Sequence, residues 1–332
     1  MAQWIIPSNI RLEGSSFCQL RCPSCPTTTK AIDPVVGKGF LKAENFRKLL
    51  EENPSLKLIE LSNYGEIFLN PEILEIMACA HEHGVTLTGN NGVNLNNVRD
   101  EVLEGVVKYG FHSMVCSIDG ATQETYAKYR VRGSLETVLG NIEKINGFKR
   151  QYGSELPRLE WQFIIFGHNE HEIEAAQRLA ESLGMTFRAK LSWDDGFSSV
   201  KDKEAVARLS GVGVASRAEF KEKHGYNYMQ GICQQLWHLP QINWDGKVLG
   251  CCRNFWGDFG ANAFTDGLEK AVNSEKMLYA REMLLGEKPA RDDIPCTTCE
   301  IYLGMKADNR FFSSGQRPLQ QLRRRQAAES ED

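Results

Sequence analysis

The chain has 332 residues, of which 42% are hydrophobic, and its mean hydropathy is -0.38. These values are typical of a globular protein, and the net charge of -4 excludes the basic surface of most nucleic-acid-binding proteins. The first residues contain neither a basic region nor a long apolar run, so we expect no signal peptide and no membrane span. Ten cysteines without a secretory signal predict a cytoplasmic protein that ligates metal rather than forming disulfides.

Predicted strands and helices alternate along the first 195 residues. A first strand within residues 4–13 leads into a cysteine-containing loop, and apolar spacing then predicts five more strands and five helices. The helices are expected at 42–52, 71–82, 97–108, 135–152 and 170–183. The strands are expected at 56–61, 85–88, 113–118, 159–166 and 186–193. About six βα units predict an α/β fold with a parallel sheet, a partial (β/α)6 TIM-like barrel rather than a closed eight-stranded one.

The rest of the chain changes character after this barrel. Residues 196–230 are predicted to be a connecting segment that contains a helix, and residues 231–305 a small cysteine-rich domain with short strands. Residues 313–332 contain polar residues, a basic triplet and an acidic end, so we expect a disordered tail. The predicted organisation is therefore a barrel at 1–195, a connector, a small domain and a tail.

The densest chemical signal is a run of three cysteines, Cys18, Cys22 and Cys25. Thiolates are soft ligands that select iron–sulfur clusters or zinc. An electron-transfer [4Fe-4S] cluster takes four cysteines, so three would leave one iron open for a reactant. A zinc loop and chance clustering are the alternatives, although structural zinc sites usually pair their cysteines as Cys-x2-4-Cys.

This Cys-x3-Cys-x2-Cys spacing resembles the signature of the radical S-adenosylmethionine (SAM) superfamily. The resemblance implies that the open iron chelates the amino and carboxylate groups of SAM. It also implies that one electron, from a flavodoxin- or ferredoxin-type donor, cleaves SAM to a 5′-deoxyadenosyl radical that abstracts a substrate hydrogen. The cofactor would carry this chemistry, while the protein positions the reactants.

The same resemblance implies residues that bind SAM. Tyr64-Gly65-Glu66 is similar to the family's Gly-Gly-Glu motif with tyrosine in place of the first glycine, and Glu66 would accept from the SAM ammonium. Asn91, before Gly92, matches the family's Thr-Asn-Gly motif at the next strand end.

Two further SAM contacts are implied at later positions. Ser117 matches the following strand end, and Arg130 matches the arginine that pairs with the SAM carboxylate, with Arg132 as its substitute. Taken singly, each of these residues could equally be an ordinary polar residue at a strand end.

A second set of cysteines lies in the C-terminal third. Asp245-Gly246 predicts a hairpin turn whose second strand ends at adjacent cysteines. This region resembles a shortened SPASM domain, or twitch domain, which holds one auxiliary [4Fe-4S] cluster; a zinc ribbon is the alternative. The ligands we assign to the auxiliary cluster are Cys233, Cys251, Cys296 and Cys299.

Cys252 would then be a spare thiol beside the auxiliary cluster. Neighbouring residues on a strand point to opposite sides, so Cys251 and Cys252 are not expected to bind the same cluster. A thiol donates hydrogen atoms to carbon radicals, and some radical SAM epimerases are similar in using a cysteine in this way. The alternative is that Cys252 is a buried, small hydrophobic residue.

These assignments predict a radical SAM enzyme with two [4Fe-4S] clusters and SAM. We favour a redox-neutral epimerase that acts on a peptide residue or an amino sugar, with a slight preference for a peptide although no leader-binding domain precedes the first strand. An oxidative dehydrogenase or peptide cross-linking enzyme is the alternative. The alternatives of another class are a non-catalytic iron–sulfur electron carrier and a zinc-stabilised binding protein.

Overall fold

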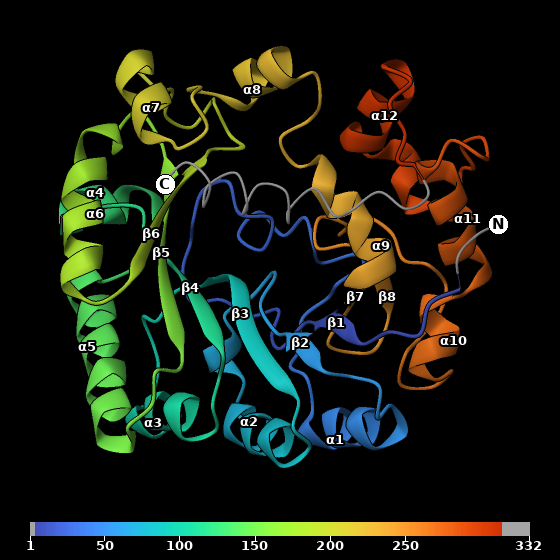
Figure 1. Ribbon diagram of the computed structural model, residues 1–332, viewed down its shortest axis with the longest axis horizontal. Coiled ribbons are helices and arrows are strands. Elements are labelled where there is room, and N and C mark those ends of the chain that lie inside the picture. Colours follow the sequence, from blue (N-terminus) through green and yellow to red (C-terminus); the bar gives the residue numbers. More distant parts are fainter. Residues whose placement is uncertain (1–3, 314–332) are drawn as a thin grey trace.

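The computed structural model describes residues 4–313, whose strands form one eight-stranded sheet (Figure 1). The strand order is β6-β5-β4-β3-β2-β1-β7-β8. The first six strands are parallel, β7 joins β1 in parallel, and β8 is antiparallel to β7. The strands are β1 Asn9–Leu12, β2 Leu58–Glu60, β3 Thr86–Val93, β4 Ser113–Ser117, β5 Arg158–Ile165, β6 Thr186–Leu191, β7 Gln241–Ile242 and β8 Val248–Gly250. Because β6 and β8 remain as edges, the predicted partial barrel is confirmed.

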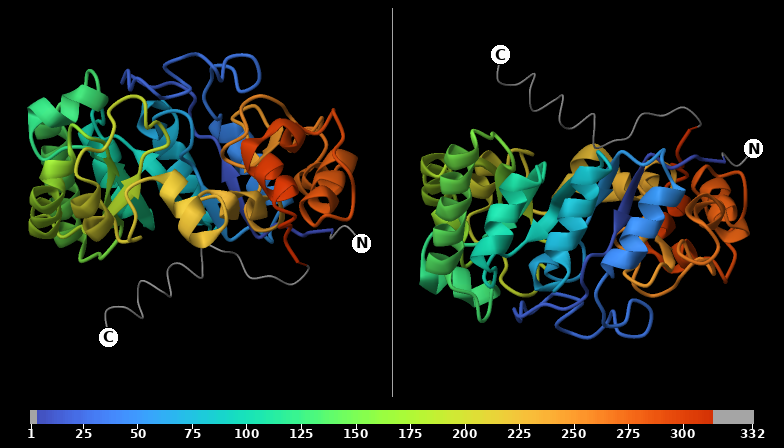
Figure 2. Two further views of the ribbon diagram at one scale, coloured as in Figure 1. Left: turned by 90° about the horizontal axis from the view of Figure 1, so that it is seen from above. Right: turned by 90° about the horizontal axis from the view of Figure 1, so that it is seen from below.

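Helices cover the outer face of this sheet, and Figure 2 shows α1, α2 and α3 side by side along it. The helices that follow the barrel strands are α1 Ala43–Glu52, α2 Ile73–Glu82, α3 Asp100–Lys108, α4 Gln123–Tyr129, α5 Leu135–Tyr152 and α6 Ile173–Ser182. The later helices are α7 Lys203–Leu209, α8 Arg217–His224, α9 Gln235–His238, α10 Leu268–Val272, α11 Glu275–Leu284 and α12 Glu300–Ala307. None of the helices in the described residues is long and apolar enough to cross a bilayer.

The two faces of the sheet differ in polarity because successive strand residues point to opposite sides. On β5, Trp161 and Phe163 are buried in the main hydrophobic core. Gln162, between them, instead accepts hydrogen bonds from side chains of β6 on the other face. The barrel therefore has an apolar outer face under its helices and a polar inner face, which is where a ligand can bind.

Three predicted features differ from the structure. β3 continues to Val93 instead of ending at residue 88, because its pairing with β4 resumes after an irregularity. The connecting segment contains two helices, α7 and α8, rather than one. In residues 231–305 the predicted hairpin is confirmed as β7 and β8, but these strands extend the barrel sheet instead of forming a sheet of their own, and several helices accompany them. The tail predicted at 313–332 lies outside the described residues, apart from residue 313.

Candidate functional site

The three-cysteine loop follows β1 and is held by the backbone after β2. The Glu66 amide donates to the Phe17 carbonyl over 2.7 Å. The chain segments approach so closely that a Cβ on Gly65 would lie 2.1 Å from the Ser15 carbonyl oxygen. Only glycine fits at residue 65, the second position of the predicted Gly-Gly-Glu motif. Tyr64 occupies the first position of that motif.

The three thiols of this loop lie in one small cluster of apolar residues, with Cys22 buried and Cys18 and Cys25 half-buried. Asn94 Nδ2 donates to Cys18 Sγ over 3.6 Å, and Arg130 Nη1 donates to Cys22 Sγ over 3.7 Å. Donors aimed at sulfur are the environment in which a thiolate-held cluster is stabilised.

The cysteines are not arranged to chelate one ion. Across residues 4–313, no group of three or more histidine, cysteine, aspartate or glutamate side chains is placed to hold a single metal ion. Cluster ligands each bind a different iron and so do not converge on one point. The three-thiol loop, with its two nitrogen donors to sulfur, fits a cluster held by thiolates.

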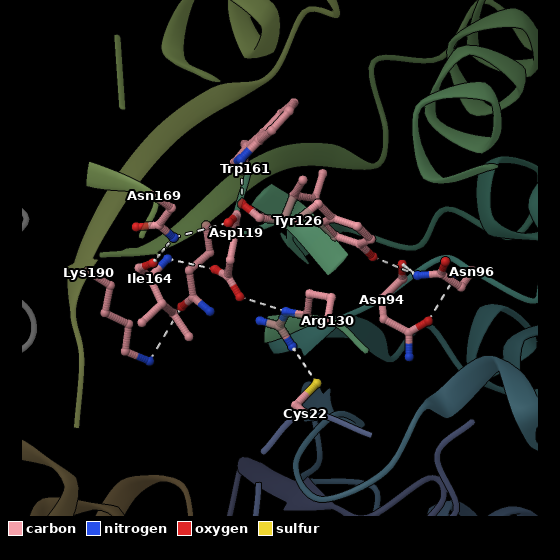
Figure 3. Close-up of polar contacts among 12 residues, drawn as sticks. Cys22, Asn94, Asn96, Asp119, Tyr126, Arg130, Trp161, Ile164, Asn169 and Lys190 are labelled. Carbon is pink, nitrogen blue, oxygen red and sulfur yellow. Dashed lines mark hydrogen bonds and ion pairs between the residues drawn. The ribbon is translucent and has the colours of Figure 1, made fainter. Parts of the chain in front are cut away.

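Arg130, the predicted partner of the SAM carboxylate, is paired with Asp119 (Figure 3). Its Nε lies 2.6 Å from Asp119 Oδ2, and Asp119 Oδ1 accepts from the Ile164 amide over 2.7 Å. Burial raises the pKa of Asp119, and the Arg130 guanidinium opposes that shift. The pair fixes the guanidinium beside Cys22, whereas Arg132, the substitute, is exposed.

Glu66 lies buried at the end of the loop after β2. Its carboxylate accepts from the Asn94 amide over 2.6 Å and from the Phe68 amide over 3.3 Å. Burial raises the pKa of Glu66 to about 7, although both hydrogen bonds favour the ionised form. Glu66 and Cys18 thus both contact Asn94, which places the predicted ammonium acceptor close to the cysteine loop.

Asn91 and Ser117 lie on the neighbouring strands β3 and β4. Asn91 Nδ2 donates to Asn63 Oδ1 over 2.9 Å, so it contacts the loop that contains Glu66. A Cβ on Gly92 would lie 2.5 Å from Ser117 Oγ. The structure therefore brings the four predicted SAM residues to one end of the barrel.

The four cysteines assigned to an auxiliary cluster line one apolar cavity in the C-terminal region. Leu236, Leu249 and Phe259 also line it. The four thiols are Cys233, Cys251, Cys296 and Cys299. Four thiols that line one cavity match the number of cysteines that a [4Fe-4S] cluster takes.

Cys252 does not line that cavity, as we expected. Our explanation, that Cys251 and Cys252 point to opposite sides of a strand, is wrong. The strand β8 ends at Gly250, and Cys251 and Cys252 lie in the turn that follows, so strand alternation does not apply. The Cys252 amide donates to Gln235 Oε1 over 2.8 Å. The half-buried thiol lies within electrostatic range of Tyr64 and Lys190, both in the barrel.

Sequence reasoning missed two residues of this site. Asn94 was missed because β3 was expected to end at residue 88, whereas it ends at Val93, directly before Asn94. Lys190 was missed because a single lysine within a predicted strand gives no sign of which side it occupies. For Asp119, which pairs with Arg130, the available signal is its position just after the strand that ends at Ser117.

Comparison with known proteins gives no match in sequence and clear matches in structure. No family model matches the chain, and no curated protein matches it. SuiB from Streptococcus suis superposes with a TM-score of 0.66 at 12% identity, over 93% of this chain and 77% of SuiB. The chain has the fold of SuiB.

Other solved structures extend the comparison of this SuiB-like fold. SuiB has been solved with S-adenosylmethionine bound, and that structure matches with a TM-score of 0.63 over 90% of this chain and 71% of SuiB, at 12% identity. BtrN, solved with AdoMet and 2-DOIA, matches with a TM-score of 0.50 at 14% identity, over 90% of this chain and 94% of BtrN. The SuiB-like fold therefore covers nearly all of the described chain.

Proposed function

We propose that this chain is a radical SAM enzyme and an epimerase, in which Cys252 returns a hydrogen atom to a substrate radical. A [4Fe-4S] cluster bound by Cys18, Cys22 and Cys25 would supply the electron that cleaves SAM to a 5′-deoxyadenosyl radical. The fold shared with SAM-bound SuiB and BtrN supports SAM binding at this end of the barrel.

The chain's own residues would bind and orient the reactants. Glu66 would accept from the SAM ammonium, and Asn91 and Ser117 would contact the rest of the molecule. Arg130 would hold the SAM carboxylate with its Nη2, since Asp119 occupies its Nε and its Nη1 donates to Cys22 Sγ. Asn94 would hold both the Glu66 carboxylate and the Cys18 sulfur in place.

The observation that carries the epimerase proposal is the position of Cys252. Its thiol lies outside the cavity lined by the other four C-terminal cysteines, yet within electrostatic range of barrel residues. A hydrogen atom passing from the Cys252 S–H to the substrate radical would form the inverted C–H bond and leave a thiyl radical. One electron from a flavodoxin- or ferredoxin-type donor and one proton would restore the thiol.

One protein that shares the fold supports a peptide as the substrate. SuiB has been solved with its precursor peptide SuiA, in a structure that matches with a TM-score of 0.60 at 11% identity over 90% of this chain and 70% of SuiB. We propose a peptide residue as the substrate in preference to an amino sugar. Residues 231–305 would form the auxiliary-cluster domain on this proposal.

Iron content and SAM cleavage test the enzyme assignment. The anaerobically reconstituted wild type should contain about eight irons and release 5′-deoxyadenosine with dithionite, as two four-iron clusters require. The Cys18→Ala, Cys22→Ala and Cys25→Ala triple variant should contain about four irons and release none. Cys79→Ala removes a buried cysteine outside both sets and should match the wild type.

Three results would contradict the assignment. Iron without SAM cleavage in the wild type would indicate an electron carrier, and zinc after anaerobic purification would indicate a binding protein. SAM cleavage retained by the triple variant would remove the cysteine loop from the chemistry.

Deuterium incorporation tests the role of Cys252. With a panel of peptides and amino sugars in D₂O, the wild type should place one deuterium on a carbon whose configuration inverts. Cys252→Ala should still release 5′-deoxyadenosine but give no inverted product. A product that has lost two hydrogens would favour the oxidative alternative, which the four-thiol cavity could serve.

A further inference from the structure

Two cationic side chains of β6, Arg188 and Lys190, face the inside of the barrel. They alternate with outward-facing Ala189, and their parallel partners on β5 are Gln162 and Ile164. Arg188 is neutralised, because its Nε lies 2.5 Å from Glu160 Oε1. Lys190 is the cation nearer the carboxyl end of the strand, where the predicted SAM residues also gather.

Lys190 has no carboxylate partner within 4 Å among residues 4–313. Its ammonium donates only to the neutral Gln162 Oε1, over 3.4 Å, and Figure 3 shows its side chain on the same side of the sheet as Asp119 and Arg130. Burial, together with the charges of Arg188 and Arg217, lowers the pKa of Lys190 to about 8. A half-buried ammonium without a counter-ion is costly, so an anion in this space would be stabilised.

Arg217 increases the positive potential at this position. It begins α8, and its Nε and Nη2 donate to the Leu191 carbonyl, over 3.2 and 3.1 Å, while its guanidinium lies 4.9 Å from the centre of the Tyr228 ring. These contacts place a second cation beside Lys190 without adding a carboxylate.

Two carboxylates in the neighbourhood form ion pairs with arginines, and a third, the exposed Asp195, acts on Arg217. Asp119 pairs with Arg130 over 2.6 Å, and Glu300 pairs with Arg253 over 2.8 Å. As with Glu160, each is matched by an arginine of its own. Within the described chain, Lys190 itself therefore has no carboxylate in an ion pair with it.

We propose that Lys190, assisted by Arg217, binds an anionic group of the substrate, a carboxylate or a phosphate. Lys190 lies within electrostatic range of both Asp119, beside the cysteine loop, and Cys252. A substrate held there by its anionic group would lie near both the predicted SAM site and the thiol that we propose as hydrogen donor. The inference rests on the proposed function, since it names the chemistry of that function's substrate.

Alkylation of Cys252 by reagents of different charge tests this inference. The anaerobic holoenzyme is treated with iodoacetate, an anion, or with neutral iodoacetamide, and modified Cys252 is quantified by peptide mass spectrometry. Each rate constant is divided by the rate constant of the same reagent with free cysteine, so that the intrinsic reactivity of the reagent cancels. In the wild type, the normalised rate with iodoacetate should exceed the normalised rate with iodoacetamide. The ratio of these two normalised rates should fall about threefold to tenfold in Lys190→Met, as expected from one nearby charge.

Two control variants accompany Lys190→Met. Lys190→Arg keeps the charge and should keep the high ratio, which separates loss of charge from loss of folding. Lys57→Met removes an exposed lysine just before β2, at the other end of the barrel, and should match the wild type. Inorganic phosphate and N-acetylglutamate are added in separate experiments to distinguish a phosphate from a carboxylate as the group that binds. The anion that the site binds should slow the alkylation of Cys252 by iodoacetate in the wild type.

The proposal fails if Lys190→Met keeps the wild-type ratio or if neither anion protects Cys252. It also fails if neither reagent reaches Cys252, because the space would then be closed to ligands. Release of 5′-deoxyadenosine by the same wild-type preparation is measured in parallel. A preparation without SAM cleavage but with the predicted ratio would contradict the proposed function and leave the anion site standing.

Discussion

Glu13 is a carboxyl group with no exposed surface, at the end of β1. It accepts from the Tyr64 amide over 3.1 Å and from the Gly65 amide over 3.3 Å. Burial nevertheless raises the pKa of Glu13 to about 8. Glu13 therefore links β1 to the loop that contains Glu66. Because the site is buried, the neutral carboxyl group is favoured there over the carboxylate.

This shift predicts a loss of stability at alkaline pH. The unfolded chain ionises Glu13 near pH 4.5, but the folded chain holds the proton up to about pH 8. The stabilisation is complete below pH 4.5 and is lost as the pH rises through 8, by roughly 2–4 kcal/mol in the free energy of unfolding. Glu13→Gln should remove this pH dependence in urea unfolding measured at pH 5 and pH 8.5.

Glu51→Gln, at an exposed site in α1, serves as the control for Glu13 and should retain the wild-type pH dependence. If the wild type and Glu13→Gln lose equal stability between the two pH values, another group is responsible.

At the scale of elements, the loop after β2 is joined to the turn after β8. The Tyr64 hydroxyl donates to the Asn254 carbonyl over 2.7 Å, and its ring packs edge-on against Phe255. Tyr64 stands where the resembling family has glycine. The substitution thus provides a contact between the predicted SAM site and the turn that contains Cys252.

Tyr64→Phe should loosen that turn while keeping the ring packed. Loss of the buried hydrogen bond leaves the Asn254 carbonyl unsatisfied and should cost about 1–3 kcal/mol in the free energy of unfolding. Backbone amides of residues 251–255 should exchange faster with deuterium, as measured by mass spectrometry. Tyr152→Phe removes a hydroxyl from an exposed side chain and should leave these amides unchanged. Unchanged exchange in Tyr64→Phe would show that the turn is held by other contacts.

At the scale of the whole molecule, the C-terminal region completes the sheet of the barrel. β7 pairs with β1, and Arg11 Nε donates to Gln241 Oε1 over 2.9 Å. Arg11 is buried, so its guanidinium depends on partners from both parts of the chain. Removing β7 would expose an unpaired edge along β1 and leave this charge without one of its acceptors.

A chain truncated after residue 230 should therefore fail to form a stable barrel. We expect aggregates on size-exclusion chromatography and no cooperative thermal transition by circular dichroism. A chain truncated after residue 313 keeps β7 and β8 and should elute without aggregates and show one thermal transition. A monomeric, cooperatively folded 1–230 chain would show that the barrel is independent of the C-terminal region.

The sequence by itself determined the alternation of strands and helices, the parallel sheet and the two groups of cysteines. These features depend on local periodicity and on spacings of a few residues, which can be read along one segment. α5 begins and ends at the predicted residues, whereas α4 was missed because its seven residues contain too little apolar periodicity.

Only the tertiary structure decided which surfaces face one another. The Tyr64–Asn254 contact joins residues 190 positions apart, and the separation of Cys252 from the four-thiol cavity arises in a turn, not on a strand. The absence of an ion-paired carboxylate at Lys190 in the described chain likewise depends on carboxylates that pair elsewhere across the barrel. Such contacts follow from packing between distant segments, for which local sequence patterns carry no signal.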